Sequence, residues 1–324
     1  MNESYDKSAI VVVLPPVGGG RLRNKSLRAW LSRSNLVRAS EVEERLSRVL
    51  QVLHLPYSDQ GLAALRMWGQ TGDRPTMWIA AADPVYLEPR LDHLYLHALR
   101  RTGVEISEMQ ALIDHLQATL ADDNRFGFVR LGSYGYLSAK TPISTATVPA
   151  YVVDQQVPYE FLPRGDDTET HRNLIGEIEM ALHDHEINLQ RVEKGQLEVN
   201  SLWIWGGGVA PEQQTRPQLP LFSNDALLTG YWYAATGQVA LWPGSIAACI
   251  DASEAGFVAE TPEFDDNPDL LESCLLELRK ALRSGRYSRI SLLFRDGLRA
   301  DMRRSDALRF WRRDSPLLDQ GSPP

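Results

Sequence analysis

Short apolar runs separated by helical patterns dominate the chain. Residues 9–14 (AIVVVL) form a continuous β-branched run, which is typical of a strand buried on both faces of a parallel sheet. Pro15 and the glycines that follow it predict a turn at the end of this strand. Further strands are expected at 200–205 and 288–294, and a hairpin at 126–139. Helices are expected over 26–37, 41–54, 59–68, 106–121, 169–185, 224–236 and 267–284, with Gly285 just past the end of the last one.

The alternation of strands and helices predicts a mixed α/β fold. We expect a core of mostly parallel strands from residues 1–75 and 200–316, with an inserted α+β lobe over 76–199. Asp83-Pro84 predicts a turn inside the lobe. The polar tail, 317–324, is expected to be disordered.

Composition narrows the classes of function. The 324-residue chain carries 34 Lys and Arg against 42 Asp and Glu, which gives a net charge of −8. This acidic balance argues against a nucleic-acid-binding protein, which needs a basic stripe. The sequence contains no run of about 18 apolar residues, the length that a membrane-spanning helix requires. Its two cysteines are too few for a disulfide framework. We therefore expect a cytoplasmic protein that binds neither nucleic acid nor membrane.

The histidines are concentrated in one part of the sequence. All seven lie between His54 and His185, so a metal site or catalytic triad cannot draw on a histidine from the C-terminal part. His183-Asp184-His185 is the one close pair. On a strand the two rings would point the same way and could share a metal, whereas at a helix C-terminus they would interact with the helix dipole. The helical interpretation is favoured.

Two other segments carry candidate chemistry. Gly206, Gly207 and Gly208 follow a predicted strand and form either a tight turn or a loop whose backbone N–H groups hold an anion. Ser58, followed by Asp59, is either a nucleophile or part of a cap on the next helix. A nucleophile would need a base or a metal within hydrogen-bonding distance. The turn and the cap are the favoured interpretations.

The segment HDHEINLQRVEKGQLEVNSLWIWGGG, residues 183–208, resembles a block shared by two related groups of proteins. One group is the archaeal-type cofactor-independent phosphoglycerate mutases of the alkaline-phosphatase-like metalloenzyme superfamily. The other group is the RpfE-type bacterial regulatory proteins. They are also similar to this chain in two further segments, WIAAADPVYL (78–87) and the FWRR ending. The resemblance implies a reduced alkaline-phosphatase-like core. The matching residues are His185, Asn188, Arg191, Gly195, Asn200, Trp203, Trp205 and Gly206–Gly208.

The same resemblance allows the metal ligands and the nucleophile of the mutases to be compared with the corresponding residues of this chain. The mutases carry an Asp-Gly pair after the first strand, where the Asp holds a metal, but the corresponding turn here, Leu14–Gly18, contains no carboxylate. Ser58 looks like the remnant of their nucleophilic serine. Their remaining ligands are Asp and His residues of the C-terminal half, where this chain has no histidine. A two-metal site needs such ligands, so neither a metal nor another cofactor is expected.

The first hypothesis for function is a metal-free, catalytically silent, phosphoglycerate mutase-like regulatory protein of the RpfE type. It would bind a small anionic metabolite or a protein partner in a cleft between lobe and core. Arg191 would contact the anion, because a guanidinium group forms paired hydrogen bonds with phosphate or carboxylate. An equally weighted interpretation is that these residues hydrogen-bond the turn that joins lobe and core. The lining residues would be His185, Asn188, Arg191, Asn200 and Gly206–Gly208.

Two other hypotheses come from different classes. One is an active phosphoglycerate mutase or phosphatase with a reduced metal site, for which Asp59, Asp83, His183 and His185 would supply the ligands. The other is a purely structural interaction protein. Its interface would include the aromatic residues 231–233, although a buried helix face is the favoured interpretation of these side chains.

Overall fold

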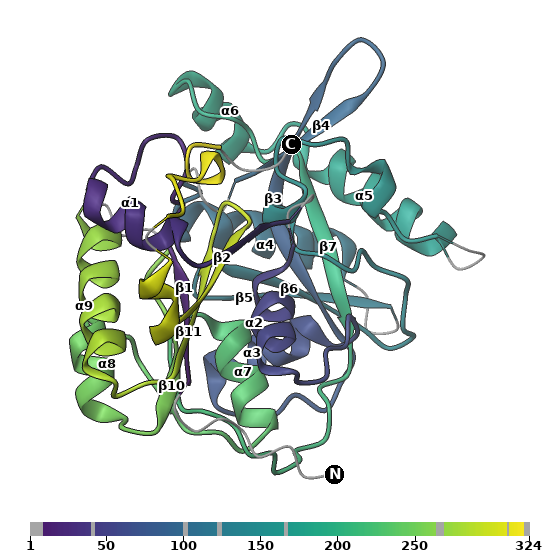
Figure 1. Cartoon of the computed structure of the whole chain (residues 1–324). Helices are drawn as coiled ribbons and strands as arrows, with labels where there is room; N and C mark the ends of the chain where they lie inside the picture. Colours follow the sequence, from purple (N-terminus) through teal and green to yellow (C-terminus); the bar gives the residue numbers. More distant parts are fainter. Residues whose placement is uncertain are drawn as a thin grey trace. The chain divides into compact units, whose positions relative to one another are not determined.

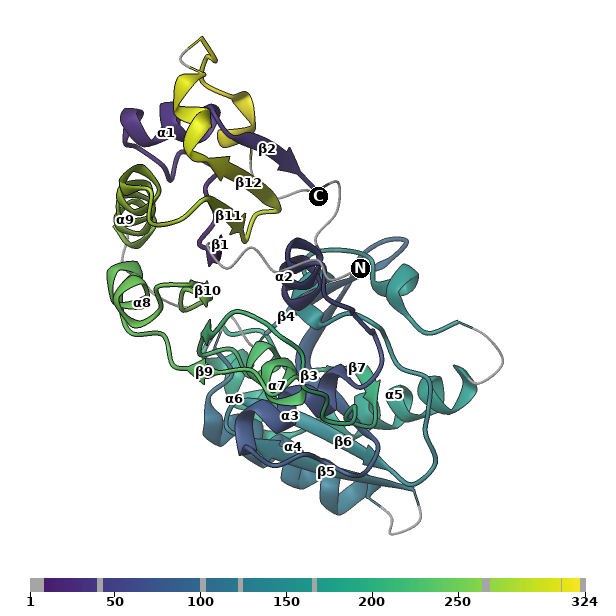
Figure 2. The same cartoon turned by 60° about the horizontal axis from the view of Figure 1, so that its bottom comes forward.

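The computed structural model describes residues 9–39, 43–99, 103–121, 125–164, 168–263, 269–309 and 311–320. The chain divides into two compact units (Figures 1 and 2). Unit 1 combines Met1–Tyr57 with Gln213–Pro324, and unit 2 is the segment Ser58–Glu212 between them. In the described ranges, no helix has the length and apolar character that crossing a membrane requires.

Unit 1 contains strands β1 (Ala9–Leu14), β2 (Asn35–Arg38), β8 (Leu221–Phe222), β9 (Val239–Ala240), β10 (Gly256–Glu260), β11 (Arg289–Phe294) and β12 (Leu298–Arg303). They form a seven-stranded sheet in the order β2-β12-β11-β1-β10-β8-β9. β1 runs parallel to β10 and β11, and β8 runs parallel to β10 and β9. β12 and β2 extend the sheet in antiparallel fashion. The mixed α/β fold with a mostly parallel sheet is therefore confirmed.

Helices cover both faces of this sheet, which explains why the central strand β1 is apolar throughout. In Figure 2, α8 and α9 lie on one side of the strands and α2 lies on the other. Ile10, Val12 and Leu14 of β1 are fully buried in the core. The helices of unit 1 are α1 (Lys25–Ser32), α2 (Arg45–Leu53), α7 (Ala226–Ala234), α8 (Ile246–Ala252), α9 (Leu270–Ser284) and the short 3₁₀ helices η3 (Arg304–Leu308) and η4 (Pro316–Leu318).

Unit 2 contains strands β3 (Ile79–Pro89), β4 (Leu94–Ala98), β5 (Phe126–Leu131), β6 (Tyr134–Ala139) and β7 (Ser201–Gly208). All the strand pairs in this five-stranded sheet are antiparallel, and the long strand β3 pairs with β4, β6 and β7. The expected α+β character of the inserted segment agrees with this arrangement. The helices are α3 (Leu62–Thr71), α4 (Ile106–Leu120), α5 (Thr168–Leu182), α6 (Glu186–Glu193) and the 3₁₀ helices η1 (Ala150–Val152) and η2 (Pro158–Phe161).

The structure moves two elements from the expected core into unit 2. The predicted core included residues up to 75 and from 200 onward, but α3 and β7 both lie within Ser58–Glu212. β7 pairs with β3 from Ser201 to Gly208, and α3 packs against these two strands. The choice of sheet is a long-range property, so the apolar run 200–205 could not reveal it.

Three local expectations are wrong. Asp83-Pro84 is not a turn, because both residues lie inside β3 and pair with Trp203 and Leu202 of β7. The expected helix 26–37 ends at Ser32 and gives way to β2. The expected disordered tail is ordered at its start, since Leu318 of η4 is fully buried in the core of unit 1; residues 321–324 lie outside the described ranges.

Candidate functional site

Charged side chains gather where the parallel strands of unit 1 end. β10 ends at Glu260, Ser223 follows the adjacent strand β8, and Arg295 follows β11, which is separated from β10 by β1. These three parallel strands place polar groups at one edge of the sheet. Arg45, in the first turn of α2, reaches the same place. This carboxyl edge is where open α/β sheets bind their ligands. We call Arg45, Ser223, Glu260, Glu263 and Arg295 the carboxyl-edge cluster.

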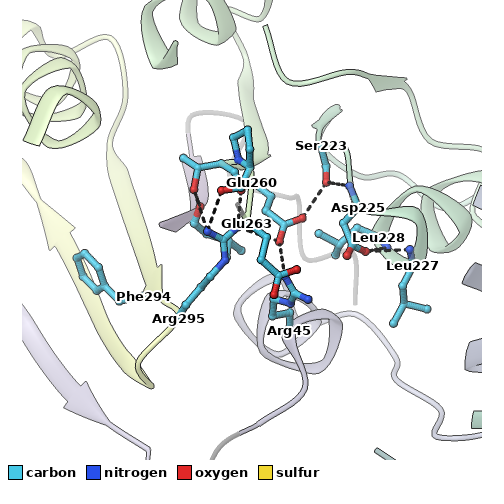
Figure 3. Close-up of polar contacts among 12 residues, drawn as sticks. Arg45, Ser223, Asp225, Leu227, Leu228, Glu260, Glu263, Phe294 and Arg295 are labelled. Atoms are coloured by element: carbon cyan, nitrogen blue, oxygen red, sulfur yellow. Dashed lines mark hydrogen bonds and ion pairs between the residues drawn. The ribbon is translucent and has the colours of Figure 1, made fainter. Parts of the chain in front are cut away.

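Glu260 lies at the centre of the cluster, and both of its carboxylate oxygens are occupied (Figure 3). Oε1 lies 3.2 Å from Nη1 of Arg45 and 3.4 Å from Nη2 of Arg295. Oε2 accepts a hydrogen bond of 2.9 Å from the Ser223 hydroxyl. Arg45 also pairs with Glu263 at 3.1 Å. The cluster is thus a closed network in which two guanidinium groups neutralise the central carboxylate.

Burial sets the electrostatics of the cluster. Glu260 is 3% exposed. Burial raises the pKa of its carboxyl group, the Asp225 carboxylate raises it further, and the two arginines oppose both effects. Burial likewise lowers the pKa of Arg295, while Glu260 acts in the opposite direction. Opposite charges that are this deeply buried are held only because each one is paired.

Glu44, next to Arg45, caps the N-terminus of α2. Its two carboxylate oxygens accept hydrogen bonds of 2.8 Å from the backbone N–H groups of Leu46 and Ser47. Burial raises the pKa of Glu44 to about 7, although these hydrogen bonds and Arg45 favour the charged form. The cap therefore titrates near neutral pH.

The turn after β1 has no carboxylate of its own, as the sequence showed, but Asp296 in the turn between β11 and β12 supplies one. Asp296 is almost fully buried, and its Oδ2 accepts hydrogen bonds from the backbone N–H groups of Val17 (3.2 Å) and Gly18 (2.8 Å). A Cβ on Gly18 would lie 1.8 Å from the Gln320 carbonyl oxygen, so only glycine fits. This carboxylate fixes the backbone of the turn.

Ser58 lies on the surface of unit 2, before α3. Its hydroxyl accepts a hydrogen bond of 3.2 Å from the N–H of Gln60, which forms a local turn. The helix itself is capped by Gly61 without a side-chain bond, so the expected cap by Ser58 or Asp59 is wrong. Both residues are exposed, and the hydrogen bonds described for the Ser58 side chain are with Gln60.

The HxH motif lies between two helices and not on a strand, with His183 directly after the last residue of α5. α5 ends at Leu182, the His183 side chain is 82% exposed, and His185 caps the next helix, α6. Nδ1 of His185 accepts a hydrogen bond of 3.2 Å from Ile187 N–H, and its ring packs edge-on against His115. Burial, followed by the charge of His115, lowers the pKa of His185. His185, rather than the pair, serves helix capping.

Asn188, Arg191 and Asn200 form buried structural contacts. The Asn188 amide bonds Val199 through both N–H and C=O, and the Asn200 amide does the same with Leu87. Arg191, 1% exposed, pairs with Glu108 and donates to the Leu197 carbonyl at 2.8 Å. These contacts favour the structural interpretation over anion binding, because the polar groups already have partners within unit 2.

Gly206–Gly208 continue β7 and form neither a tight turn nor an anion loop. The N–H of Gly206 bonds the Ala146 carbonyl at 2.8 Å, and the N–H of Gly207 bonds the Thr145 hydroxyl at 3.0 Å. A Cβ on Gly208 would lie 2.5 Å from the backbone nitrogen of Gly61. The glycines therefore allow β7 to approach the start of α3.

We expect Gly207→Ala to lower the free energy of unfolding by about 2 kcal/mol, because overpacking a filled site costs this much. The new methyl group would lie 2.6 Å from the Trp78 ring and 2.9 Å from the Thr145 hydroxyl. Urea unfolding measures the change. Gly176→Ala is the matched control: nothing lies within 4 Å of its methyl group, so that helical position should become slightly more stable. A neutral Gly207→Ala would contradict the packing role.

The remaining candidates also have structural partners. Asp83 lies 5% exposed in a buried ion pair with Arg66 at 2.8 Å and accepts a hydrogen bond from the Trp205 indole at 2.6 Å. Trp232 of α7 is fully buried and donates to the Leu219 carbonyl. The favoured interpretation of residues 231–233 as a buried helix face is thus confirmed for Trp232.

Comparison with curated proteins shows that part of the chain is similar to known enzymes. A protein of Methanosarcina mazei is 33% identical over 112 residues, which is 34% of this chain and 28% of that protein. A protein of Methanosarcina acetivorans is 29% identical over 118 residues, 36% of this chain and 30% of that one. Both are described as 2,3-bisphosphoglycerate-independent phosphoglycerate mutases. About a third of this chain is similar to these mutases.

The similarity is confined to part of each protein. The matched segments span less than a third of the length of these two curated mutases, and no family model matches the chain. Among solved structures, a cofactor-independent phosphoglycerate mutase of Thermoplasma acidophilum aligns over 91% of this chain and 88% of its own, at 16% identity and a TM-score of 0.41. A Pyrococcus horikoshii protein aligns over 93% and 88%, at 11% identity and a TM-score of 0.46.

The resemblance to phosphoglycerate mutases implies a pair of divalent metal ions, and the described residues do not fit them. In the part of the chain that the structure describes, no three His, Cys, Asp or Glu side chains are grouped so that they could hold a metal. Glu260, the central acid of the carboxyl-edge cluster, has both oxygens bound to arginine or serine. Oδ2 of Asp296 accepts hydrogen bonds from the turn after β1 and lies 3.8 Å from Nη2 of Arg38.

Sequence reasoning missed the carboxyl-edge cluster. Arg45 and Glu260 are 215 residues apart, so no local motif joins them. A usable signal was present: Ser223, Glu260 and Arg295 each stand at or just after the end of an apolar run, LF, FVAE and SLLF. In a parallel sheet such positions meet at one edge.

Proposed function

We propose that this chain is a phosphoglycerate mutase-like protein of the RpfE regulatory type that binds its ligand or partner without transferring phosphate. Support for the mutase-like part comes from the partial similarity to curated mutases. The alkaline-phosphatase-like relationship of the core and a cytoplasmic location belong to this proposal.

The observation that carries the proposal is that both carboxylate oxygens of Glu260 are bonded to arginine or serine. Phosphoryl transfer by two metal ions needs carboxylates and imidazoles that are free to coordinate, because the metals neutralise the transferred group and activate the nucleophile. Here two guanidinium groups hold the carboxylate at 3.2 and 3.4 Å. Ser58, the remnant nucleophile, is exposed and bonded only to Gln60 among the described residues.

The test is a coupled assay for conversion of 3-phosphoglycerate to 2-phosphoglycerate, with and without manganese. We expect no turnover above the background of a heat-denatured sample, whereas the Methanosarcina mazei mutase assayed in parallel should be active. Metal analysis of the purified protein provides a second readout. Manganese-dependent turnover that disappears in Ser58→Ala would overturn the proposal and favour an active mutase or phosphatase.

A further inference from the structure

A basic groove lies on unit 1, away from the residues considered so far. It has a volume of about 880 Å³ and runs between α1, α9 and the end of β12 with the following helix η3. Figures 1 and 2 both place α1 beside the end of α9. We call it the arginine groove, after Arg33, Arg279, Arg283, Arg303 and Arg304, which line it together with Trp30.

Positive charge in the groove is far in excess of negative charge. Five guanidinium groups face one carboxylate, that of Asp306. This carboxylate already pairs with Arg309 at 3.1 Å and accepts the Arg303 N–H at 2.8 Å. Within the described ranges, none of the five lining arginines takes part in an ion pair. The chain as a whole carries a net charge of −8, so this excess is local.

Crowding like charges has an energetic cost that a bound anion would remove. Arg279 and Arg283 stand four residues apart on α9, a spacing at which like charges destabilise a helix. A second depression of about 440 Å³, lined by the same two arginines and Lys280, continues the basic surface. Negative charge placed between these groups would offset the repulsion.

Two arginines are held in position by hydrogen bonds. Nη1 of Arg279 donates to the Ser26 hydroxyl at 2.6 Å, and Nη1 of Arg33 donates to the Ala307 carbonyl at 3.3 Å. Arg283, Arg303 and Arg304 are exposed and able to reach toward a ligand. A guanidinium group binds phosphate or carboxylate through paired N–H donors. The groove therefore offers several guanidinium groups, each with paired N–H donors, to one ligand.

The floor of the groove is apolar. Leu282 and Met302 are almost fully buried beneath it, and Trp30 is half-buried against the core. Small-molecule sites combine such an apolar lining with a few polar groups and have volumes of about 300–1,000 Å³. We propose that the arginine groove binds a small organic anion that carries at least two phosphate or carboxylate groups. This assignment does not depend on whether the chain turns over phosphoglycerate.

The test is calorimetric titration of the full chain with inorganic pyrophosphate and with ADP, at low ionic strength and without metal. We expect saturable binding at one site per chain. Arg283→Glu/Arg304→Glu should weaken it by at least about tenfold, because two charge-assisted contacts are lost and repulsion replaces them. Both side chains are exposed, so the variant should fold, which its circular dichroism and thermal midpoint would verify.

Lys194→Glu is the matched control, since it reverses an exposed charge in unit 2 and should leave the affinity within about twofold. Two results would overturn the proposal: no saturable heat from either probe, or affinity unchanged in Arg283→Glu/Arg304→Glu. A 20-nucleotide single-stranded DNA that binds more tightly than both probes and displaces them would reassign the groove to nucleic acid. None of these outcomes depends on the mutase assay.

Discussion

Arg66→Met should cost unit 2 about 3–5 kcal/mol of unfolding free energy, because it leaves the buried Asp83 carboxylate without its counter-ion. Arg66 is 3% exposed and donates to Asp83 (2.8 Å), to the Tyr136 hydroxyl (3.2 Å) and to the Gly135 carbonyl (3.0 Å). Its guanidinium carbon also lies 5.2 Å from the centre of the Trp205 ring. No other ion pair described in unit 2 is enclosed by so many aromatic rings.

Urea unfolding followed by tryptophan fluorescence measures this loss. Arg66→Met combined with Asp83→Asn is the informative comparison, because it removes the uncompensated charge along with the arginine. The double variant should recover part of the stability, and the coupling energy follows from the two single variants. A loss below about 1 kcal/mol in Arg66→Met would show that the pair contributes like a surface ion pair.

A second large effect is expected when the pH is raised, because the titration of Glu44 changes the free energy of unfolding. Its pKa is raised from the model-peptide range to about 7 in the folded protein. The native state therefore binds the proton more tightly than the unfolded chain, so the stabilisation is complete below about pH 4.5 and is lost as the pH rises through 7. Between pH 5 and 8 this single group should remove about 2–3 kcal/mol from the free energy of unfolding.

Unfolding of wild type and Glu44→Gln at several pH values isolates this contribution. Glutamine keeps an oxygen for one of the two capping N–H groups but does not titrate. The stability difference between the two proteins should therefore shift in favour of the variant as the pH rises. Glu254→Gln, at a side chain 90% exposed, is the control and should show little change. Parallel pH profiles for wild type and Glu44→Gln would contradict a raised pKa.

The elements that the sequence predicted well are those whose pattern is local. The run 9–14 became the buried strand β1, the alternating segment 126–139 became the β5–β6 hairpin, and Gly285 ends α9 with a positive φ of 79°. Each depends on side chains within a few positions along the chain. In such segments, local preference and tertiary packing favour the same structure.

The sequence-based predictions were incomplete where contacts with residues far away in the sequence determine the local structure. Asp83-Pro84 has the composition of a turn, yet pairing with β7 and the ion pair with Arg66 hold it in a strand. The resemblance suggested a ligand contact or a structural role for Asn188 and Arg191 with equal weight, and the structural contact of Arg191 with Glu108, 83 residues away, could not be recognised from the local sequence. The carboxyl-edge cluster was missed for the same reason, since its members come together only when the sheet forms.

In the sheet of unit 1, β1 is translated long before the two strands that pair with it. β1 leaves the ribosome early, but its two neighbours, β10 and β11, are translated only after all of Ser58–Glu212. The inserted unit is contiguous and can fold while β1 still has no partner. The apolar AIVVVL segment therefore lacks both partner strands until Gly256–Glu260 has been translated, a state in which exposed strands tend to aggregate. Nascent chains arrested before residue 256 should consequently depend on chaperones more than the finished protein does.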